Sequence, residues 1–499
     1  MIDRVPALLP SGGAGARRLV LSMLDTTPWT TQLQSGRRKS LVWAAAMRLG
    51  LALLVIAAVL LAGFVVILVR PTAAPAALVP LVERLTGANP RPLKLLLPPN
   101  RPLSALARIG EQIFQDRSLS ASGLQSCASC HSPARSYGPP DDRSAELGGP
   151  EMSSEGIRPP PSLAYLYRQA IFSIGPAAEE NDAPPSFSQL AQQAQNTVRA
   201  TKSAGSAPAV AALVPQGGLF WDGRADTLMD QAKGPMMNPA EMANTSVAGV
   251  ARKLQRAGYD KMLEPLFGPV VVRNPSMLFQ EAMSAVSRYQ IEALAFHRFD
   301  SKYDAWLQGK ARLSPAEMRG MKLFNDPAKG NCAGCHLSQP ALDGLPPLFT
   351  DTEYEALGVP RNPRLAANRD PAFHDLGLCG PLRTDLARQT QYCGMFLTPT
   401  LRNVARRGVY FHNGVYHDLH DVLRFYDFRD TQPSRIYPRD AKGRVTKYDD
   451  LPRRYWANVD VADAPFDRKE GEHPALTDAE MEDIIAFLGT LDDGYKRPR

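Results

Sequence analysis

Hydrophobic positions in this chain follow helical spacing in several segments and alternate as a strand does almost nowhere. The longest such segment is an unbroken apolar run from Leu49 to Val69, bounded by Arg48 and Arg70. Its twenty-one residues are enough to cross a bilayer as a helix. Because basic residues precede the run, we expect the N-terminus to stay in the cytoplasm and everything after Arg70 to lie outside.

A cleaved signal peptide is the alternative interpretation of this run. A start at Met47 would leave a short basic segment ahead of it, and the alanines between residues 73 and 77 could supply a cleavage site. The run is long for the apolar part of a signal peptide. We therefore favour an uncleaved anchor.

Two further helical segments have similar sequences. Residues 103–116 carry apolar side chains at helical spacing, and a matching segment follows Ser314, which forms a predicted capping box with Glu317. The sequence Ile-Gly-Glu-Gln-Ile-Phe-Gln-Asp at 109–116 resembles Arg-Gly-Met-Lys-Leu-Phe-Asn-Asp at 319–326. This similarity indicates an internal duplication.

The rest of the chain adds helices and one irregular segment. Residues 280–307 are predicted core helices, and residues 477–491 form a helix capped by Thr477 and Glu480. Residues 179–216 are rich in Pro, Ala, Gln and Ser and are predicted to be an insertion or surface loop. The predicted fold class is mainly α, with two similar domains in tandem after one transmembrane helix.

These patterns divide the chain into five parts. We expect a basic cytoplasmic segment over 1–48, the anchor over 49–69, a Pro- and Ala-rich linker over 70–102, and two domains over 103–308 and 309–499. Of the formal net charge of +7, residues 1–48 contribute +5. The two domains are therefore nearly neutral, which makes nucleic acid an improbable partner.

A five-residue motif follows each of the two similar helices. Cys-Ala-Ser-Cys-His at 127–131 recurs as Cys-Ala-Gly-Cys-His at 332–336. Cys-x-x-Cys-His is the attachment motif of c-type haem, in which both thiols bind the porphyrin and the histidine binds iron. The predicted attachment residues are Cys127, Cys130 and His131 in the first motif and Cys332, Cys335 and His336 in the second. The two domains in tandem are therefore predicted to be cytochrome c-like haem domains.

A Cys-x-x-Cys pair can also be a redox dithiol or part of a zinc site. A redox dithiol would leave the histidine without a role, and a zinc site would need two more ligands at a suitable spacing. The remaining cysteines, Cys379 and Cys393, belong to neither motif. In the oxidising compartment predicted for this part of the chain they are expected to form a disulfide, with two buried free thiols as the alternative.

The sixth position of each haem iron decides its chemistry, because an open position can bind peroxide. No histidine lies between His131 and His297, so the first haem is expected to be open. The methionines that could close it instead are Met152, Met229, Met236, Met237 and Met242. Over an open iron, Glu241 could act as acid and base with Gln231 as its hydrogen-bonding partner, although a lone glutamate is more often a surface residue.

The motifs together resemble the bacterial di-haem cytochrome c peroxidase and MauG superfamily, over roughly residues 103–495. The resemblance rests on both haem motifs, Phe-Trp-Asp-Gly-Arg at 220–224, the spaced Gln231 and Glu241, Thr-Pro-Thr-Leu-Arg-Asn-Val at 398–404 and Tyr-Phe-His-Asn-Gly at 410–414. It implies that Trp221 lies between the haems and transfers electrons. It also implies that Gln231, Glu241 and Pro235 line the peroxide-binding pocket.

The distal ligand of the second haem separates the branches of this superfamily. The peroxidase branch has a methionine fourteen residues after the histidine that matches His412, whereas this chain has Tyr426. The resemblance to MauG implies that the Tyr426 phenolate binds iron and favours high oxidation states. A buried, hydrogen-bonded core tyrosine is the alternative role for Tyr426. Rival ligands on chemistry alone are Met395, His417 and His420.

Two departures from the family pattern change the expectation. The positions that match the family's calcium ligands hold Pro159, Arg407 and Val409, so calcium is doubtful. The peroxidase branch also has a histidine that closes the first haem until reduction. Its place here holds none, so activation by reduction is not expected.

The sequence therefore predicts a membrane-anchored di-haem peroxidase of the bacterial inner membrane, with its catalytic part in the periplasm and two covalently bound haem c groups. It would reduce hydrogen peroxide with electrons from a donor such as a small cytochrome c or cupredoxin, using high-valent haem intermediates. A homodimer is the oligomer to test. The alternatives are a MauG-like oxidase that modifies a partner protein and a non-catalytic electron-transfer cytochrome.

Overall fold

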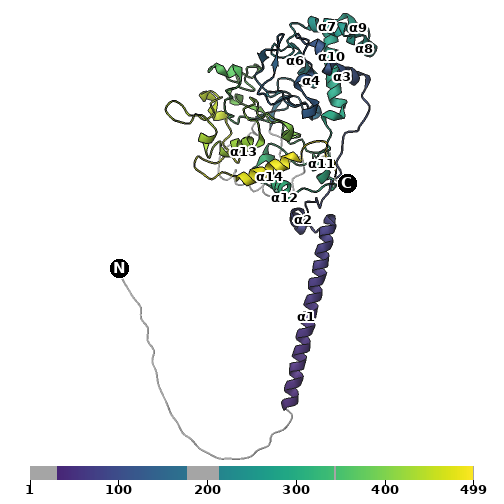
Figure 1. Ribbon diagram of the computed structural model, residues 1–499, viewed down its shortest axis with the longest axis vertical. Helices are drawn as coiled ribbons and strands as arrows, with labels where there is room; N and C mark the ends of the chain where they lie inside the picture. The colour runs from purple at the N-terminus through teal and green to yellow at the C-terminus, as the bar shows by residue number, and fades with distance from the viewer. Residues whose placement is uncertain (1–30, 177–212, 342–343, 498–499) are drawn as a thin grey trace, which may run out of the picture. The chain divides into compact units, whose positions relative to one another are not determined.

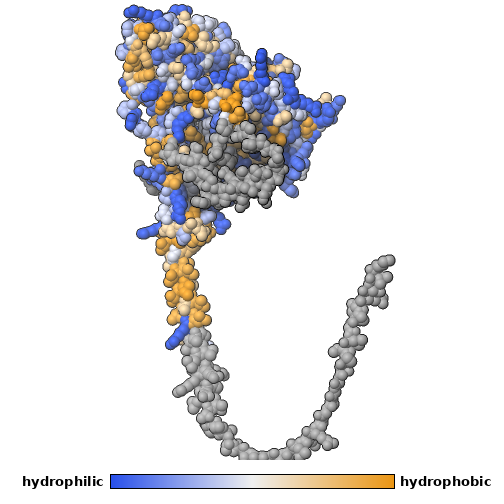
Figure 2. All heavy atoms as spheres, turned by 180° about the vertical axis from the view of Figure 1, so that it is seen from behind, coloured by the Kyte–Doolittle hydropathy of each residue, from blue (hydrophilic) through white to orange (hydrophobic). Residues whose placement is uncertain are grey.

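The computed structural model describes residues 31–176, 213–341 and 344–497, and it divides into two units, residues 1–69 and 70–499. In the first unit, helix α1 (Thr31–Val69) includes a stretch, Met47–Val69, that is long and apolar enough to cross a membrane. Figure 2 shows its apolar side chains as a continuous column. The predicted basic segment 1–48 lies largely outside the described residues.

The second unit is built from short helices and very short strands (Figure 1). Its helices are α2 (Val79–Thr86), α3 (Ala105–Gln115), α4 (Cys127–Cys130), α6 (Leu228–Met237), α7 (Val247–Arg256), α8 (Tyr259–Phe267), α9 (Val270–Arg273), α10 (Pro275–Glu292), α11 (Lys302–Leu307), α12 (Pro315–Asn325), α13 (Leu419–Phe428) and α14 (Asp478–Gly489). The prediction of a mainly α protein is confirmed.

The strands form three antiparallel pairs in the described residues. They are β1 (Leu147–Gly148) with β2 (Ser154–Glu155), β3 (Ser173–Pro176) with β4 (Leu213–Gln216), and β5 (Tyr354–Glu355) with β6 (Phe396–Leu397). The pair of β3 and β4 brackets residues 177–212. Most of the predicted insertion at 179–216 therefore lies outside the described residues, and its last four residues form β4.

The two largest hydrophobic clusters of the described residues are the first and second cores of the second unit. The first extends from Ile109 to Phe296 and the second from Tyr303 to Leu491, with α11 packed in the second. Both of the similar helices form as predicted, α3 with Ser104 as its N-cap and α12 with the capping box of Ser314 and Glu317. One core lies in each half of the second unit, while the division into two domains and the boundary at residue 308 stay predictions.

A glycine lies at the main helix crossing of each core. Helix α3 packs against α10, and α12 packs against α14 (Figure 1). A Cβ atom at Gly110 would overlap the carbonyl oxygen of Ala285, and one at Gly320 would overlap that of Asp483. Because these two glycines hold the same place in the similar sequences, the structure repeats the same close crossing in both halves.

Substituting either crossing glycine with alanine is expected to lower the free energy of unfolding by about 1–3 kcal/mol, because the backbone must move to admit a methyl group. Gly320→Ala should lower the unfolding midpoint of the holoprotein in guanidinium chloride. Gly489→Ala at the end of α14 is the matched control, since nothing lies within 4 Å of its added Cβ. Equal stability of Gly320→Ala and the parent would contradict the close crossing.

The segment predicted as a linker, 70–102, is more ordered than its composition indicated. It contains α2, and Leu95 packs on the second core. The Asn89 Nδ2 donates to the carbonyl oxygen of Leu307 at 3.1 Å. Helix α2 escaped prediction because it has only eight residues and lies in a Pro-rich stretch.

Candidate functional site

Each Cys-x-x-Cys-His motif begins a short helical turn, so that its histidine faces a cavity. The Nδ1 of His131 lies 3.2 Å from the carbonyl oxygen of Tyr137, and the Nδ1 of His336 lies 3.0 Å from that of Phe349. Since a carbonyl can only accept, each Nδ1 carries the proton and Nε2 is left to bind a metal ion. Burial lowers the pKa of both imidazoles to about 4, which keeps them in the neutral, metal-binding form.

The first cavity brings together residues that are far apart in the sequence. It is lined by Cys127, Cys130 and His131 from the motif and by Gln231, Pro235 and Glu241 from α6 and the turn after it. Met242 also lines it, whereas the other four candidate methionines do not among the described residues. All three residues that the resemblance assigned to the peroxide pocket therefore face the first motif.

Glu241 is held in position by its own turn. Asn238 Nδ2 donates to Glu241 Oε1 at 2.6 Å. Burial raises the pKa of the Glu241 carboxyl, while the charge of Arg224 and the Asn238 hydrogen bond oppose this rise. A carboxyl whose pKa is raised by burial takes up a proton more readily than an exposed one, as a group that relays protons must. Asn238 was missed from the sequence, although its spacing of three residues from Glu241 fits a turn.

The second cavity is larger, about 310 Å³. Its wall includes Cys332, Cys335 and His336 from the motif and Tyr426 from α13. The rival ligands Met395, His417 and His420 do not line it among the described residues. Of the four candidates, Tyr426 alone shares a cavity with His336.

Tyr426 packs among aromatic rings. Its ring stacks on Phe466 with a centroid separation of 5.5 Å. Burial raises the pKa of Tyr426, and the buried guanidinium of Arg429 opposes this shift. The donor set of a histidine and a tyrosine across one cavity, with two thiols on its wall, fits a covalently attached haem with two protein ligands.

Trp221 contacts the segment that connects the two cavities. It lines the second cavity, and its indole Nε1 donates to the carbonyl oxygen of Pro159 at 3.1 Å. The segment that contains Pro159 runs from the second cavity to the first, because Ser162 lines the second and Leu163 lines the first. Trp221 therefore lies in the second cavity against the segment that leads to the first, and its role in electron transfer stays a prediction.

A buried network of ion pairs joins the two halves next to Trp221. Arg158 donates to Asp375 through Nε and Nη2 at 2.6 and 2.7 Å, and to Asp222 through Nη1 at 2.8 Å. Arg224 also pairs with Asp222, at 2.8 Å. Burial alone would raise the pKa of Asp375, but the Arg158 guanidinium outweighs it and the pKa falls below its usual value. Sequence analysis missed Arg158 and Asp375, which are 217 residues apart.

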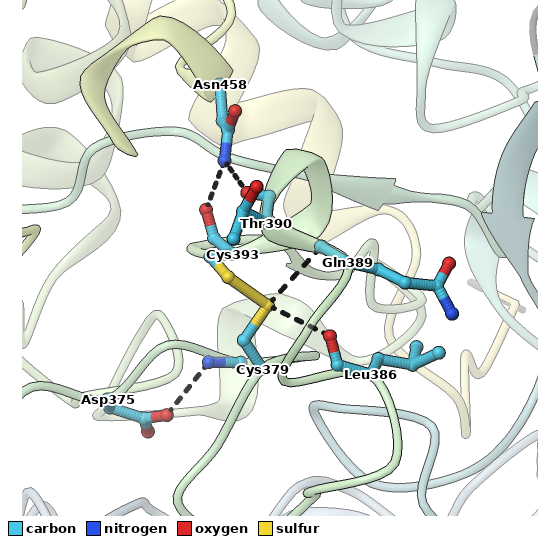
Figure 3. Close-up of a disulfide and its surroundings, with 8 residues drawn as sticks. Asp375, Cys379, Leu386, Gln389, Thr390, Cys393 and Asn458 are labelled. Atoms are coloured by element: carbon cyan, nitrogen blue, oxygen red, sulfur yellow. Dashed lines mark hydrogen bonds between the residues drawn. A yellow bond between two sulfur atoms is a disulfide. The ribbon is translucent and has the colours of Figure 1, made fainter. Parts of the chain in front are cut away.

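The predicted disulfide is confirmed. Cys379 and Cys393 are bonded, and the segment they close begins just after Asp375 (Figure 3). Gly377 N donates to Asp375 Oδ1 at 3.1 Å, which ties the disulfide loop to the ion-pair network. In the chain-entropy account, a loop of this length contributes about 3 kcal/mol to stability.

The positions that match calcium ligands do not fit a calcium ion. Pro159, Arg407 and Val409 all line the second cavity, and none offers a carboxylate. The Arg407 Nη2 donates to the carbonyl oxygens of Thr400 and Arg402, each at 3.1 Å. A guanidinium thus occupies backbone oxygens of the kind a calcium ion would use, and no group of three metal-binding side chains occurs among the described residues.

Comparisons with known proteins agree with this arrangement. A sequence profile for di-haem cytochrome c peroxidase matches residues 104–312. Methylamine utilization protein MauG of Paracoccus denitrificans is 32% identical over 400 residues, covering 79% of this chain and 90% of that protein. Cytochrome c551 peroxidase of Nitrosomonas europaea is 27% identical over 326 residues, covering 65% and 72%. The crystal structure of the diheme peroxidase BthA of Burkholderia thailandensis matches with a TM-score of 0.66 at 37% identity, over 79% of this chain and 87% of that one.

Proposed function

Because the chain belongs to the family of di-haem cytochrome c peroxidases and MauG, we propose that it is a peroxidase that reduces hydrogen peroxide to water. Electrons come from a periplasmic protein donor, and α1 anchors the enzyme in the inner membrane. The observation that carries the proposal is the meeting of Glu241, Gln231 and His131 around one cavity. A cytochrome that only transfers electrons does not require an oriented carboxylate in the first cavity.

The proposed work of the first cavity is proton transfer. A haem held by Cys127, Cys130 and His131 would supply peroxide binding and electron transfer. Glu241 would accept a proton from one peroxide oxygen and deliver it to the other, which leaves as water. Asn238 holds the carboxylate for both steps, and the Gln231 amide orients the peroxide by hydrogen bonding. Two electrons and two protons per peroxide complete the reduction to two waters.

The proposed work of the second cavity is to receive electrons and pass them on. His336 and Tyr426 are the proposed iron ligands, and Trp221 is the proposed path toward the first cavity. The ion pairs of Asp222 and Arg158 hold the backbone beside Trp221. A phenolate ligand stabilises iron in its higher oxidation states, so Tyr426 favours storing an oxidising equivalent at the second site.

A MauG-like oxidation of a partner protein is the second candidate function, favoured by Tyr426 in the second cavity and by the relative with 32% identity. The two functions differ in the final electron source. Peroxide-dependent oxidation of reduced small cytochrome c at catalytic rates would support the peroxidase. A covalent change in a co-purifying protein, without catalytic use of the cytochrome, would support the oxidase.

Rapid mixing of the fully oxidised holoprotein with one equivalent of hydrogen peroxide tests the proposal. We expect the absorption of both haems to change before any reductant is added, because the first cavity offers no second histidine among the described residues. A response only after one-electron reduction would show a first haem closed at rest, with Met242 as the nearest candidate ligand. No response in either state would leave an electron-transfer cytochrome.

A further inference from the structure

An aromatic cluster that the proposed function does not use lies behind one wall of the second cavity. The ring of Tyr448 meets that of Trp456 edge-on at a centroid separation of 5.7 Å and that of Tyr437 at 5.8 Å. Tyr448 is 7% exposed, whereas Trp456 is half-buried and reaches the surface. Tyr448 and Trp456 together therefore extend from the interior of the protein to its surface.

The inner end of this cluster touches the cavity wall. Gly358 and Leu451 both line the second cavity. A Cβ atom at Gly358 would overlap the Tyr448 ring, so the ring lies directly against the Gly358 backbone. Tyr437 donates its hydroxyl proton to the carbonyl oxygen of Gly358 at 2.6 Å. One backbone segment separates Tyr448 from the cavity that holds His336 and Tyr426.

Tyr448 also has a proton acceptor. Its hydroxyl donates to Asp430 Oδ1 at 3.3 Å, and the Asp430 side chain also forms ion pairs with Lys447 and Arg429, each at 2.6 Å. A tyrosine that loses an electron becomes strongly acidic, and a carboxylate in contact can take the proton. Oxidation of Tyr448 therefore leaves a neutral radical, with no new charge buried beside the ring.

Trp456 lacks a proton acceptor of this kind. Its indole Nε1 donates to the carbonyl oxygen of Leu451 at 2.9 Å, and a carbonyl does not take up a proton. The guanidinium of Arg453 lies 5.5 Å from the centre of its ring, which disfavours a lasting positive charge there. An oxidising equivalent should rest on Tyr448 and pass through Trp456 only briefly.

We propose that Tyr448 and Trp456 form a relay that carries electrons from a protein donor at the surface to the second haem. The proposal rests on the proposed function, which supplies the oxidant as the peroxide-oxidised second haem. Tyr448 gives one electron to that haem and its phenolic proton to Asp430. Trp456 then returns an electron to Tyr448, which recovers its proton, and the donor reduces Trp456. The donor loses one electron per cycle.

The charge around Trp456 indicates the kind of donor. Arg453 and Arg454 are exposed beside it, and the Arg454 guanidinium covers the ring of Tyr455 at 4.7 Å. A docking face with two arginines favours a one-electron protein donor that presents acidic side chains around its redox centre. Electron delivery through Trp456 should accordingly weaken as salt is added.

The test combines freeze-quenched electron paramagnetic resonance with stopped-flow absorption. After peroxide is mixed with the oxidised holoprotein in the absence of donor, we expect a tyrosyl radical whose spectrum changes with ring-deuterated tyrosine. Tyr448→Phe should abolish that radical while both haems still respond to peroxide. Trp456→Phe should keep the radical but slow electron delivery from a reduced acidic small cytochrome c at least tenfold. Tyr455→Phe is the matched control and should change neither.

The outcomes separate the relay from the function it rests on. A normal haem response to peroxide with no radical, or with a radical that survives Tyr448→Phe, would overturn the relay alone. Electron delivery that is unchanged in Trp456→Phe would also overturn it and place the entry at the cavity mouth near Asp463, which is exposed. No haem response in any of these proteins would remove the proposed function and the relay together.

Discussion

Replacing Glu241 with glutamine is expected to lower peroxide turnover at least about a hundredfold while both haems remain attached. Glutamine keeps the size of the side chain and its contact with Asn238, but it cannot accept a proton. Steady-state consumption of hydrogen peroxide measures the loss, and the haem content per polypeptide shows whether attachment is intact. The expected effect is large because only Glu241, among the carboxylates of the described residues, lines the first cavity.

A matched control is available on the same half of the molecule. Glu264 lies exposed on α8 and lines neither cavity, so Glu264→Gln should turn over peroxide at the parent rate. Turnover by Glu241→Gln within a factor of about three of the parent would remove Glu241 from the proton-transfer role. Loss of haem from Glu241→Gln would instead point to a structural role.

Replacing Tyr426 with methionine is expected to shorten the life of the peroxide-oxidised protein at least tenfold and to raise the reduction potential of the second haem. A neutral thioether stabilises reduced iron, whereas a phenolate stabilises oxidised iron. Stopped-flow absorption measures the lifetime, and a spectroelectrochemical titration measures the potential. The absorption of the first haem should be unchanged, because Tyr426 lines only the second cavity.

Tyr416→Phe is the control for this substitution. Tyr416 lies 6.0 Å from Phe425 of α13 by ring centroids but does not line the second cavity, so its loss should leave both quantities unchanged. An unchanged potential in Tyr426→Met would contradict ligation by Tyr426. The rivals His417 and His420 would then have to reach the iron by a movement of the chain.

Sequence and structure agree best where the determining residues are neighbours. The Cys-x-x-Cys-His motifs, the capping boxes at Ser314 and Thr477 and the apolar run of α1 each depend on interactions within a few residues. The disulfide also closes a short loop, with a separation of 14 residues. Such features do not depend on how distant segments pack, so they can be predicted without tertiary information.

The family resemblance added residues that local patterns could not select. Glu241 and Tyr426 look like ordinary surface or core residues when they are taken singly. Only their spacing from the other motifs marked them, and in the structure Glu241 lines one cavity with His131 and Tyr426 lines the other with His336. The substitutions Glu241→Gln and Tyr426→Met test whether these residues perform the chemistry assigned to them.

Other features followed no signal in the sequence. Arg158 pairs with Asp375 across 217 residues, and Tyr448 packs on Gly358 across the wall of the second cavity. Buried ion pairs and ring contacts of this kind use residue types that are common everywhere in the chain. Their partners are chosen by the packing of whole segments, which no window of the sequence contains.

The sequence by itself determined where the two Cys-x-x-Cys-His motifs lie, which of the longer helices form and that an apolar helix precedes the domains, because each depends on short-range chemistry or on hydrophobic spacing. Only the tertiary structure decided that Glu241 faces His131, that Tyr426 rather than Met395 faces His336, and which rings connect the second cavity to the surface. The physical reason is that a cavity is a property of several packed segments, and its lining is fixed by how their side chains fill space.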